Sequence, residues 1–141
     1  TDKNTLQSKA YENVFVIGDA TNLPTSKAGS VAHFEAEILE ENILKYINGQ
    51  PLNAKFDGHA NCFVETGNGK ALLIDFNYEQ EPVEGTFPIA GIGPMKLLKE
   101  NRINHMGKLA FRWVYWNMLL KGIPIPFVST NMSTKGKKIE A

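Results

Sequence analysis

The feature that most constrains the fold is an unbroken apolar run, Val14-Phe15-Val16-Ile17, which ends sharply at Gly18-Asp19. A run of β-branched and aromatic residues of this length is typical of a strand that is buried on both faces inside a parallel sheet. Such a strand needs neighbouring strands and helical cover, and the few residues that precede it supply neither. We therefore expect it to be the last strand of a larger sheet in a longer protein.

A helix is predicted next, from Ala28 to Asn48. Apolar residues keep a helical spacing, while acidic residues that include Glu35 are expected on the solvent side. Gly49 stands where a left-handed C-terminal cap is expected, and Pro51 prevents the helix from continuing. The apolar positions of this helix are Val31, Phe34, Ile38, Leu39, Ile43, Tyr46 and Ile47.

The hydrophobic period changes after Phe56. Residues 61–66 and 70–76 are predicted to form a hairpin around Gly67-Asn68-Gly69, because these residues tolerate positive φ. Residues 79–94 indicate a loop with at most one edge strand near 86–89, since the segment is rich in proline and glycine.

The rest of the chain is predicted to be helical from Pro94 to Leu120, in one or two pieces that break near 104–107, and then to end in a frayed basic tail over 129–141. The expected fold class is therefore α+β. It combines the last strand and helix of one domain in residues 1–49 with a small antiparallel hairpin sheet and C-terminal amphipathic helices in residues 50–141.

The net charge of zero conceals two oppositely charged parts of the chain. Residues 1–95 carry six basic and thirteen acidic residues, whereas residues 96–138 carry nine basic residues and one acidic residue. This asymmetry predicts that the C-terminal part meets an anionic partner, either a membrane surface or a nucleic acid. A single cysteine, Cys62, excludes an internal disulfide and a multi-cysteine metal site, and no metal is expected.

A membrane surface is favoured by the segment from Trp113 to Leu120. It is apolar nearly all round, basic residues flank it, and eight residues are too few to cross a bilayer. Aromatic side chains at headgroup depth with lysines and arginines near the phosphates are typical of an interfacial helix. Packing on a protein partner is the second interpretation, and a nucleic acid is disfavoured because the aromatic residues are contiguous with aliphatic ones. The residues expected at the membrane are Trp113, Tyr115, Trp116, Leu119 and Leu120.

Gly18 and Asp19 are candidate ligand-binding residues. The carboxyl end of a buried strand is where open α/β sheets bind ligands, and a carboxylate there can accept hydrogen bonds from ribose or ribityl hydroxyls. The helix start at Ala28-Gly29 would direct its positive N-terminal end to the same place. The alternative is an ordinary turn between strand and loop. Neither Gly67-Asn68-Gly69 nor Gly91-Ile92-Gly93 fits a dinucleotide loop, because each lacks the third glycine.

Cys62 is the candidate for redox chemistry. A lone cysteine in an apolar strand is usually a small buried hydrophobic residue. His59 is the nearest base in the sequence, but strand alternation places it on the opposite face. Local chemistry alone therefore leaves both a reactive and a packing role open.

Three segments together resemble the sulfide:quinone oxidoreductases, which are FAD-dependent members of the pyridine nucleotide-disulfide oxidoreductase superfamily. The first is Asn13 to Lys27, which contains Gly-Asp-Ala-Thr-Asn-Leu-Pro-Thr-Ser-Lys and is similar to the second FAD-binding signature of the family. The second is Phe56 to Cys62 followed by Thr66-Gly67, although Phe63 stands where the family commonly has proline. The third is Tyr115 to Gly122, which is similar to the family's C-terminal membrane-binding helix.

The resemblance implies a C-terminal fragment of a peripheral membrane flavoenzyme, at the cytoplasmic membrane, that oxidises sulfide and reduces quinone. Cys62 would be one cysteine of a redox-active pair. The FAD site would include Gly18, Asp19, Lys27, Ala28 and Gly29, and Lys27 would also lie near the quinone. The implied partners are sulfide, a membrane quinone, the membrane surface, the missing N-terminal FAD domain and further copies in a homo-oligomer, but no nucleic acid. The fragment alone is expected to be inactive and to bind little or no FAD.

Two other functions stay open at this point. One is an oligomerisation or interaction module in which Cys62 is structural. The other is a flavoprotein similar to the type II NADH:quinone oxidoreductases, which would leave Cys62 without a role in catalysis.

Overall fold

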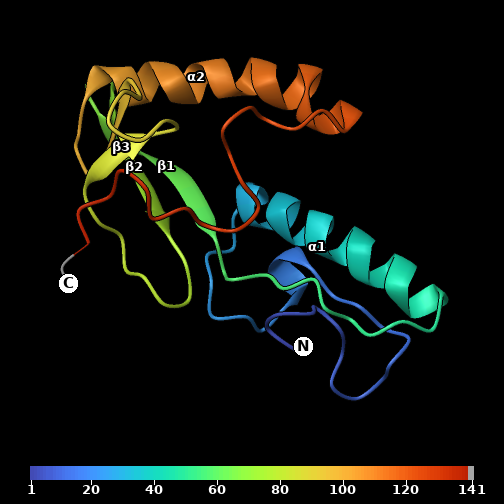
Figure 1. The fold of residues 1–141 in the computed structure, drawn as a ribbon. Helices are drawn as coiled ribbons and strands as arrows, with labels where there is room; N and C mark the ends of the chain where they lie inside the picture. Colours follow the sequence, from blue (N-terminus) through green and yellow to red (C-terminus); the bar gives the residue numbers. More distant parts are fainter. Residues whose placement is uncertain (140–141) are drawn as a thin grey trace. The chain divides into compact units, whose positions relative to one another are not determined.

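The computed structural model describes residues 1–139 and confirms the predicted α+β class (Figure 1). The chain divides into two compact units. Unit 1 comprises residues 1–61, 76–81 and 130–132, and unit 2 comprises residues 62–75, 82–129 and the segment from residue 133 onward. The boundary predicted after Gly49, as the limit of an FAD-binding domain, stays a prediction.

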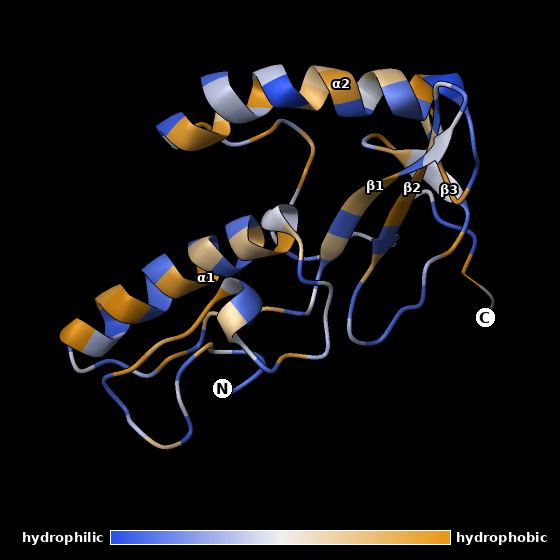
Figure 2. Ribbon diagram, turned by 180° about the vertical axis from the view of Figure 1, so that it is seen from behind, coloured by the Kyte–Doolittle hydropathy of each residue, from blue (hydrophilic) through white to orange (hydrophobic). Residues whose placement is uncertain are grey.

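Unit 1 is built on helix α1, Gly29–Ile47, which confirms the helix predicted over 28–48. Val31, Phe34 and Ile38 are buried along one side, and hydrophobic and hydrophilic residues alternate along the helix in Figure 2. The helix ends as expected: Gly49 has φ of 65°, and the amide of Gln50 donates to the carbonyl of Lys45 at 2.9 Å. This is the Schellman arrangement that a glycine after the last turn favours.

Two polar residues of α1 are buried in the core of unit 1. Asn42 donates to the carbonyls of Thr5 and Ala54 at 3.1 and 3.0 Å and accepts from the amide of Ala54 at 3.2 Å, so it holds two other segments against the helix. Glu35 is 1% exposed, so the prediction that it faces solvent is wrong. The helical spacing places Glu35 beside Phe34 and Ile38 on the buried side, where a partner for its carboxylate is available.

The predicted buried strand at 14–17 is not formed. In the described residues this run makes one isolated antiparallel bridge, between Phe15 and Gln7, and Val14 is 41% exposed. A strand becomes stable only when neighbouring strands take up its backbone hydrogen bonds. Here the backbone of the segment pairs with the N-terminal residues, where the amide of Val16 donates to the carbonyl of Leu6 at 3.0 Å.

The sheet has four strands in the order β1-β2-β4-β3. Strands β1, Ala60–Gly67, and β2, Lys70–Phe76, confirm the predicted hairpin, and Asn68 between them has φ of 52°. Strand β3, Gly85–Phe87, confirms the predicted edge strand. Strand β4, Met95–Leu97, pairs with β3 in antiparallel and with β2 in parallel orientation, so the sheet is mixed and larger than the predicted hairpin.

Helix α2, Arg102–Asn117, covers part of unit 2 and begins later than predicted. It begins at Arg102 and not near Pro94, because the side chain of Asn101 accepts from the amide of Asn104 at 2.8 Å and caps the first turn. It also runs unbroken through 104–107. A Cβ at Gly107 would lie 2.8 Å from the sulfur of Met95, so glycine serves close packing against β4 and does not interrupt the helix.

The basic tail is docked and not frayed as far as Ile139. Lys137 forms a bridge to Gly85 of β3, and the amide of Lys138 donates to the carbonyl of Glu84 at 2.8 Å. The ammonium of Lys137 lies 2.7 Å from the carboxylate of Asp75, and both side chains are at most 5% exposed. Backbone pairing at a sheet edge and a buried ion pair therefore hold the segment. Neither interaction can be predicted from a local sequence pattern.

Candidate functional site

The first predicted site element, Gly18-Asp19, forms a short 3-10 helix, η1, Gly18–Ala20, in unit 1. The amide of Gly18 donates to the carboxylate of Glu35 at 2.6 Å. Burial raises the pKa of Glu35, and this effect outweighs the opposing effects of the Gly18 hydrogen bond and of Lys27. Asp19, the next residue, is exposed, so its carboxylate is accessible to a ligand.

Lys27 closes the loop between η1 and α1. Its ammonium donates to the carbonyl and the hydroxyl of Thr21 at 3.0 and 2.7 Å. Thr21 is itself buried and also donates from its hydroxyl to the carbonyl of Gly18 at 2.9 Å. The predicted binding residue Lys27 therefore fixes the shape of this loop.

The N-terminal end of α1 is open. Ala28 is the N-cap residue, in extended conformation, and it provides no side-chain acceptor for the first helical amides. A Cβ placed on Gly29 would meet no atom within 4 Å. The helix dipole favours an anionic group at this end.

Two hydrogen bonds join this part of unit 1 to the segment that precedes Cys62. The hydroxyl of Ser30 donates to the carbonyl of Asn61 at 2.7 Å, and that of Thr25 donates to the carbonyl of Gly58 at 2.9 Å. The first turn of α1 is therefore tied to the residue that is bonded directly to Cys62. The side-chain nitrogen of Asn61 is buried and has no hydrogen-bond partner among the described residues. A buried donor without a partner is unusual in a folded protein.

Cys62 itself lies on β1 and is half-buried. The imidazole of His59 is buried, stacks on Phe34 with 4.4 Å between ring centroids, and has Nδ1 3.0 Å from the carbonyl oxygen of Thr130. Among residues 1–139, no three acidic, histidine or cysteine side chains are grouped so that they could hold a metal ion.

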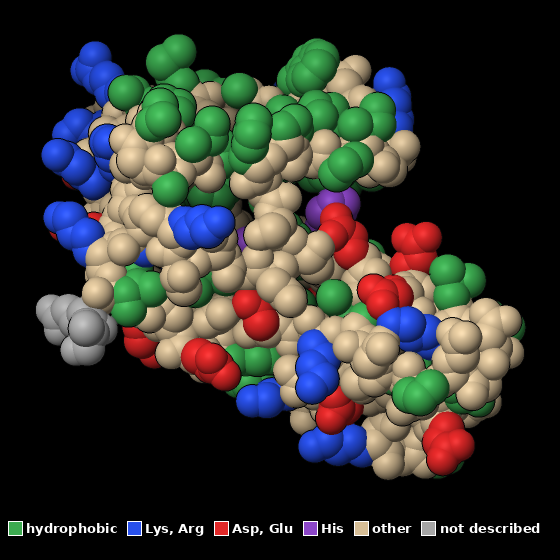
Figure 3. Space-filling model, in the orientation of Figure 1, with side chains coloured by type: hydrophobic (Ala, Val, Ile, Leu, Met, Phe, Trp, Pro, Cys, Tyr) green, Lys and Arg blue, Asp and Glu red, His purple; other side chains and the backbone are tan. Residues whose placement is uncertain are grey.

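Helix α2 carries an exposed apolar stripe. At about 100° per residue, the exposed side chains of 103, 106, 109, 113 and 116 fall on one side of the helix. Figure 3 shows hydrophobic side chains gathered along this helix, with lysine and arginine side chains near both ends. The stripe consists of Ile103, Met106, Leu109, Trp113 and Trp116 and is followed by Leu120, which is also exposed.

The stripe separates the predicted membrane residues into two groups. Trp113 and Trp116 are 63% and 59% exposed on the stripe. Tyr115 lies about 160° around the helix from Trp113, and Leu119 is half-buried. No helix in the described part of the chain is both long enough and apolar enough to span a bilayer.

Sequence reasoning identified Gly18, Asp19, Lys27, Ala28 and Gly29, which the structure gathers in unit 1. It missed Glu35 and Asn61. For Glu35 the signal was its place between two buried apolar positions of the helix, whereas nothing in the sequence indicates that the amide of Asn61 would be buried without a partner.

Known proteins with similar sequences cover most of this chain. The mitochondrial sulfide:quinone oxidoreductase of Mus musculus is 38% identical over 122 residues, which are 86% of this chain and 26% of that protein. The mitochondrial sulfide:quinone oxidoreductase of Schizosaccharomyces pombe is 35% identical over 85% of this chain and 26% of its own length. The FAD-dependent oxidoreductase FVFD30 of Flammulina velutipes is 35% identical over 48% of this chain and 21% of its own length.

The chain belongs to the sulfide:quinone oxidoreductase family. The predicted resemblance is thereby confirmed, and the chain corresponds to the C-terminal part of proteins of which it spans about a quarter. The names of the relatives place them in mitochondria and do not support the expected cytoplasmic membrane. No family model matches the chain.

One solved structure shows a similar fold. A chain of the Tetrahymena thermophila mitochondrial ATP synthase structure, determined by cryo-electron microscopy, has a TM-score of 0.57 and 31% identity. The match covers 86% of this chain and 26% of that chain.

Two features of unit 1 fit a bound FAD. The exposed carboxylate of Asp19 is a suitable acceptor for ribityl or ribose hydroxyls, and the open N-terminal end of α1 is suited to negative charge.

Proposed function

We propose that the whole protein to which this chain belongs oxidises sulfide and transfers two electrons to a membrane quinone through a cysteine disulfide and FAD. The observation that carries the proposal is the 35–38% identity to sulfide:quinone oxidoreductases over 85–86% of the chain. The hydrogen bond between Ser30 of α1 and Asn61 supports it, because Asn61 precedes Cys62 in the chain and is held at the start of the helix that carries the candidate flavin site.

Cys62 is proposed to pair with a second cysteine, which this 141-residue sequence does not contain. Hydrosulfide attacks the disulfide, the S–S bond breaks, a persulfide forms on one cysteine, and the other cysteine leaves as a thiolate. After a nucleophilic sulfur acceptor has removed the outer sulfur of the persulfide, the two cysteine thiolates re-form the S–S bond and release two electrons, for which FAD, when bound, would supply the acceptor on the way to quinone.

The residues around α1 are proposed to form one wall of the flavin and quinone site. Asp19 accepts hydrogen bonds from flavin hydroxyls, and the amides at Ala28 and Gly29 stabilise negative charge on the ring. Lys27 keeps the loop between them in shape through Thr21. This chain alone binds FAD weakly and does not turn over, because it spans about a quarter of its relatives.

Helix α2 is proposed to place the protein on the surface of a mitochondrial membrane. The exposed stripe that contains Trp113 and Trp116 enters the headgroup region, and the basic residues at both ends of the helix bind lipid phosphates. The second candidate, an oligomerisation module, is favoured by the same exposed stripe, because a second copy could bury it. Salt separates the two: membrane binding through basic residues weakens as salt rises, whereas apolar self-association does not.

The proposed activity is tested with the purified whole protein by comparing sulfide and NADH as electron donors for quinone reduction. Reduction with sulfide alone is expected. Reduction with NADH and not with sulfide would overturn the proposal and favour a protein similar to type II NADH:quinone oxidoreductases.

A further inference from the structure

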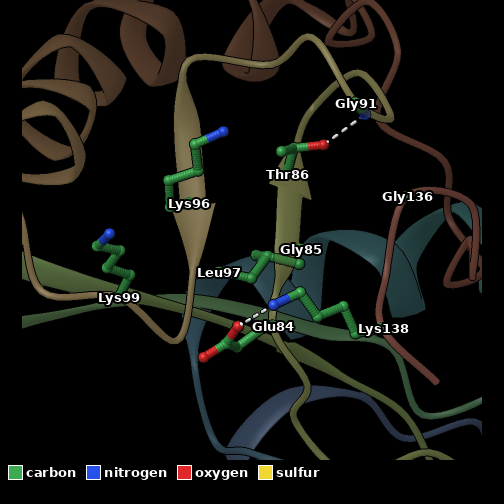
Figure 4. Close-up of a pocket in the computed structure, with 9 residues that line it drawn as sticks. All are labelled: Glu84, Gly85, Thr86, Gly91, Lys96, Leu97, Lys99, Gly136 and Lys138. Carbon is green, nitrogen blue, oxygen red and sulfur yellow. Dashed lines mark hydrogen bonds and ion pairs between the residues drawn. The ribbon is translucent and has the colours of Figure 1, made fainter. Parts of the chain in front are cut away.

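The charged side chains around a cavity of unit 2 do not converge on one ligand (Figure 4). This cavity of about 350 Å³ is lined by residues of β3, β4 and the docked C-terminal segment. The ammonium groups of Lys96 and Lys99 point apart in Figure 4, and Lys138 is paired with Glu84 at 2.6 Å. In unit 1, by contrast, several polar groups converge on a single turn of the backbone.

Hydrogen bonds hold Gly18 at both its amide and its carbonyl group. The carboxylate of Glu35 accepts from the amide at 2.6 Å, while the hydroxyl and the amide of Thr21 donate to the carbonyl at 2.9 and 3.1 Å. Lys27 fixes Thr21 in turn, because its ammonium donates to the threonine hydroxyl at 2.7 Å. Asp19, the next residue after Gly18, is exposed, and its carboxylate makes no hydrogen bond or ion pair with the described part of the chain. The turn is therefore held in place while the carboxylate of Asp19 is left to a ligand.

Gly18 does not determine the conformation of this turn by itself. Its φ is 67°, in the left-handed region, which glycine adopts about as readily as negative values of φ. The direction in which the chain continues into Asp19 therefore depends on the groups that bind the peptide of Gly18. Glu35 is the side chain that binds its amide.

The carboxyl group of Glu35 lies where an apolar side chain would be expected. Glu35 is 1% exposed and lies among the buried apolar positions of α1. Burial raises its pKa; the hydrogen bond from Gly18 and the charge of Lys27 oppose this effect, and the charge of Asp19 adds to it. An apolar side chain of similar volume would fill this position with no carboxyl group to desolvate. The carboxyl group therefore serves the turn at Gly18 more than it serves the packing of the core.

We propose that Glu35 is a positioning residue of the flavin site, which directs the carboxylate of Asp19 toward the ribityl or ribose hydroxyls of FAD by accepting a hydrogen bond from the amide of Gly18. Since Glu35 is buried, it acts through the turn and not by contact with the cofactor. The inference rests on the FAD site proposed above. The loss of one hydrogen bond between a carboxylate and a flavin hydroxyl corresponds to about tenfold weaker binding of FAD.

The test measures how fast the whole protein releases FAD, from the fluorescence of the released flavin. Glu35→Gln keeps the length of the side chain and an acceptor oxygen, whereas Glu35→Asp keeps the charge but is one methylene shorter. We expect release at the wild-type rate from Glu35→Gln and about tenfold faster release from Glu35→Asp. Release from Glu35→Asp at the wild-type rate, or release from Glu35→Gln that is as fast as from Glu35→Asp or faster, would overturn the proposal.

A double-mutant cycle with Asp19→Ala separates positioning from a general structural effect. If Glu35 acts through Asp19, Glu35→Asp accelerates the release of FAD from the wild type but adds little in the Asp19→Ala background. Equal acceleration in both backgrounds would overturn the proposal.

Asn42→Ala is the matched control, because Asn42 is a second buried polar residue of α1 and binds Thr5 and Ala54 instead of the turn. Asn42→Ala should lower the stability against urea and leave the release of FAD unchanged. Acceleration of release as large as that of Glu35→Asp would assign the effect to stability and overturn the proposal. A wild type that contains no FAD would refute the flavin site itself, whereas a wild type that contains FAD and shows equal effects in both backgrounds would refute only the role of Glu35.

Discussion

The carboxylate of Glu35 accepts a hydrogen bond from the backbone amide of Gly18, with 2.6 Å between the two atoms. This contact joins the second turn of α1 to the 3-10 turn that carries Asp19. A buried carboxylate in this position makes the local structure sensitive to pH, since its charged form is penalised by burial.

Glu35→Gln is expected to make the stability of the chain less dependent on pH. Burial raises the pKa of Glu35 above its ordinary value of 4.5, so the folded state binds the proton more tightly than the unfolded state. The resulting stabilisation is complete below pH 4.5 and is lost as pH rises through the raised pKa. In urea unfolding between about pH 4 and 8, the free energy of unfolding of the variant should therefore rise relative to that of the wild type as pH increases. The exposed Glu40→Gln is the control, and parallel curves for Glu35→Gln and the wild type would contradict the expectation.

Gly58→Ala is expected to destabilise the chain severely, by about 3 kcal/mol or more. Gly58 has φ of 86°, and a Cβ there would lie 2.3 Å from a ring carbon of Tyr78. Gly49→Ala is the matched control, because Gly49 has φ of 65° and open space around it. The control should lose only about 1 kcal/mol in chemical denaturation. Similar losses in both variants would show that the Tyr78 ring is not packed on Gly58.

Lys137→Met is expected to cost about 3–5 kcal/mol, because it removes the ion pair between Lys137 and the buried carboxylate of Asp75. The further change Asp75→Leu in the same chain should restore much of this loss, since it removes the buried charge. Lys138→Met breaks only an exposed pair with Glu84 and should cost about 1 kcal/mol or less. Denaturation curves measure all three, and equal effects of Lys137→Met and Lys138→Met would contradict the docked tail.

Trp113→Ser/Trp116→Ser is expected to weaken the binding of the chain to anionic vesicles by at least about tenfold, since both indole rings lie on the exposed stripe. Tyr115→Ser changes an aromatic residue on another side of the same helix and should have a much smaller effect. Cosedimentation with vesicles measures the difference. If the Tyr115 variant loses as much binding as the double tryptophan variant, the stripe is not the membrane-binding surface.

Local sequence patterns correctly predicted the helices and strands whose stabilising contacts lie close together in the sequence. The helix over 29–47 has its own apolar period and its own glycine cap, and the hairpin has a turn that accepts positive φ at 67–69. Elements that depend on distant partners were predicted wrongly. Residues 14–17 have strand character but no neighbouring strands, and residues 95–97 became a strand because β2 and β3 flank them.

The same distinction applies to the site. The sequence indicated Gly18, Asp19 and the start of α1, because a glycine, a carboxylate and a helix N-terminus have recognisable chemistry. It did not reveal the burial of Glu35, the unpartnered amide of Asn61 or the pairing of Lys137 with Asp75, since each depends on which segments meet in three dimensions. The sequence left open whether the helix breaks near 104–107, whereas in the structure packing on Met95 requires that Gly107 has no side chain.

The redox role of Cys62 is tested most directly by anaerobic reduction of the bound flavin with sulfide, in the whole protein and in its Cys62→Ser variant. The absorbance of oxidised FAD should be lost on mixing the wild type with sulfide. The Cys62→Ser variant should retain FAD and its oxidised spectrum, because serine cannot form the disulfide that sulfide attacks. Loss of the absorbance at the wild-type rate in the variant would contradict the account and assign Cys62 to packing.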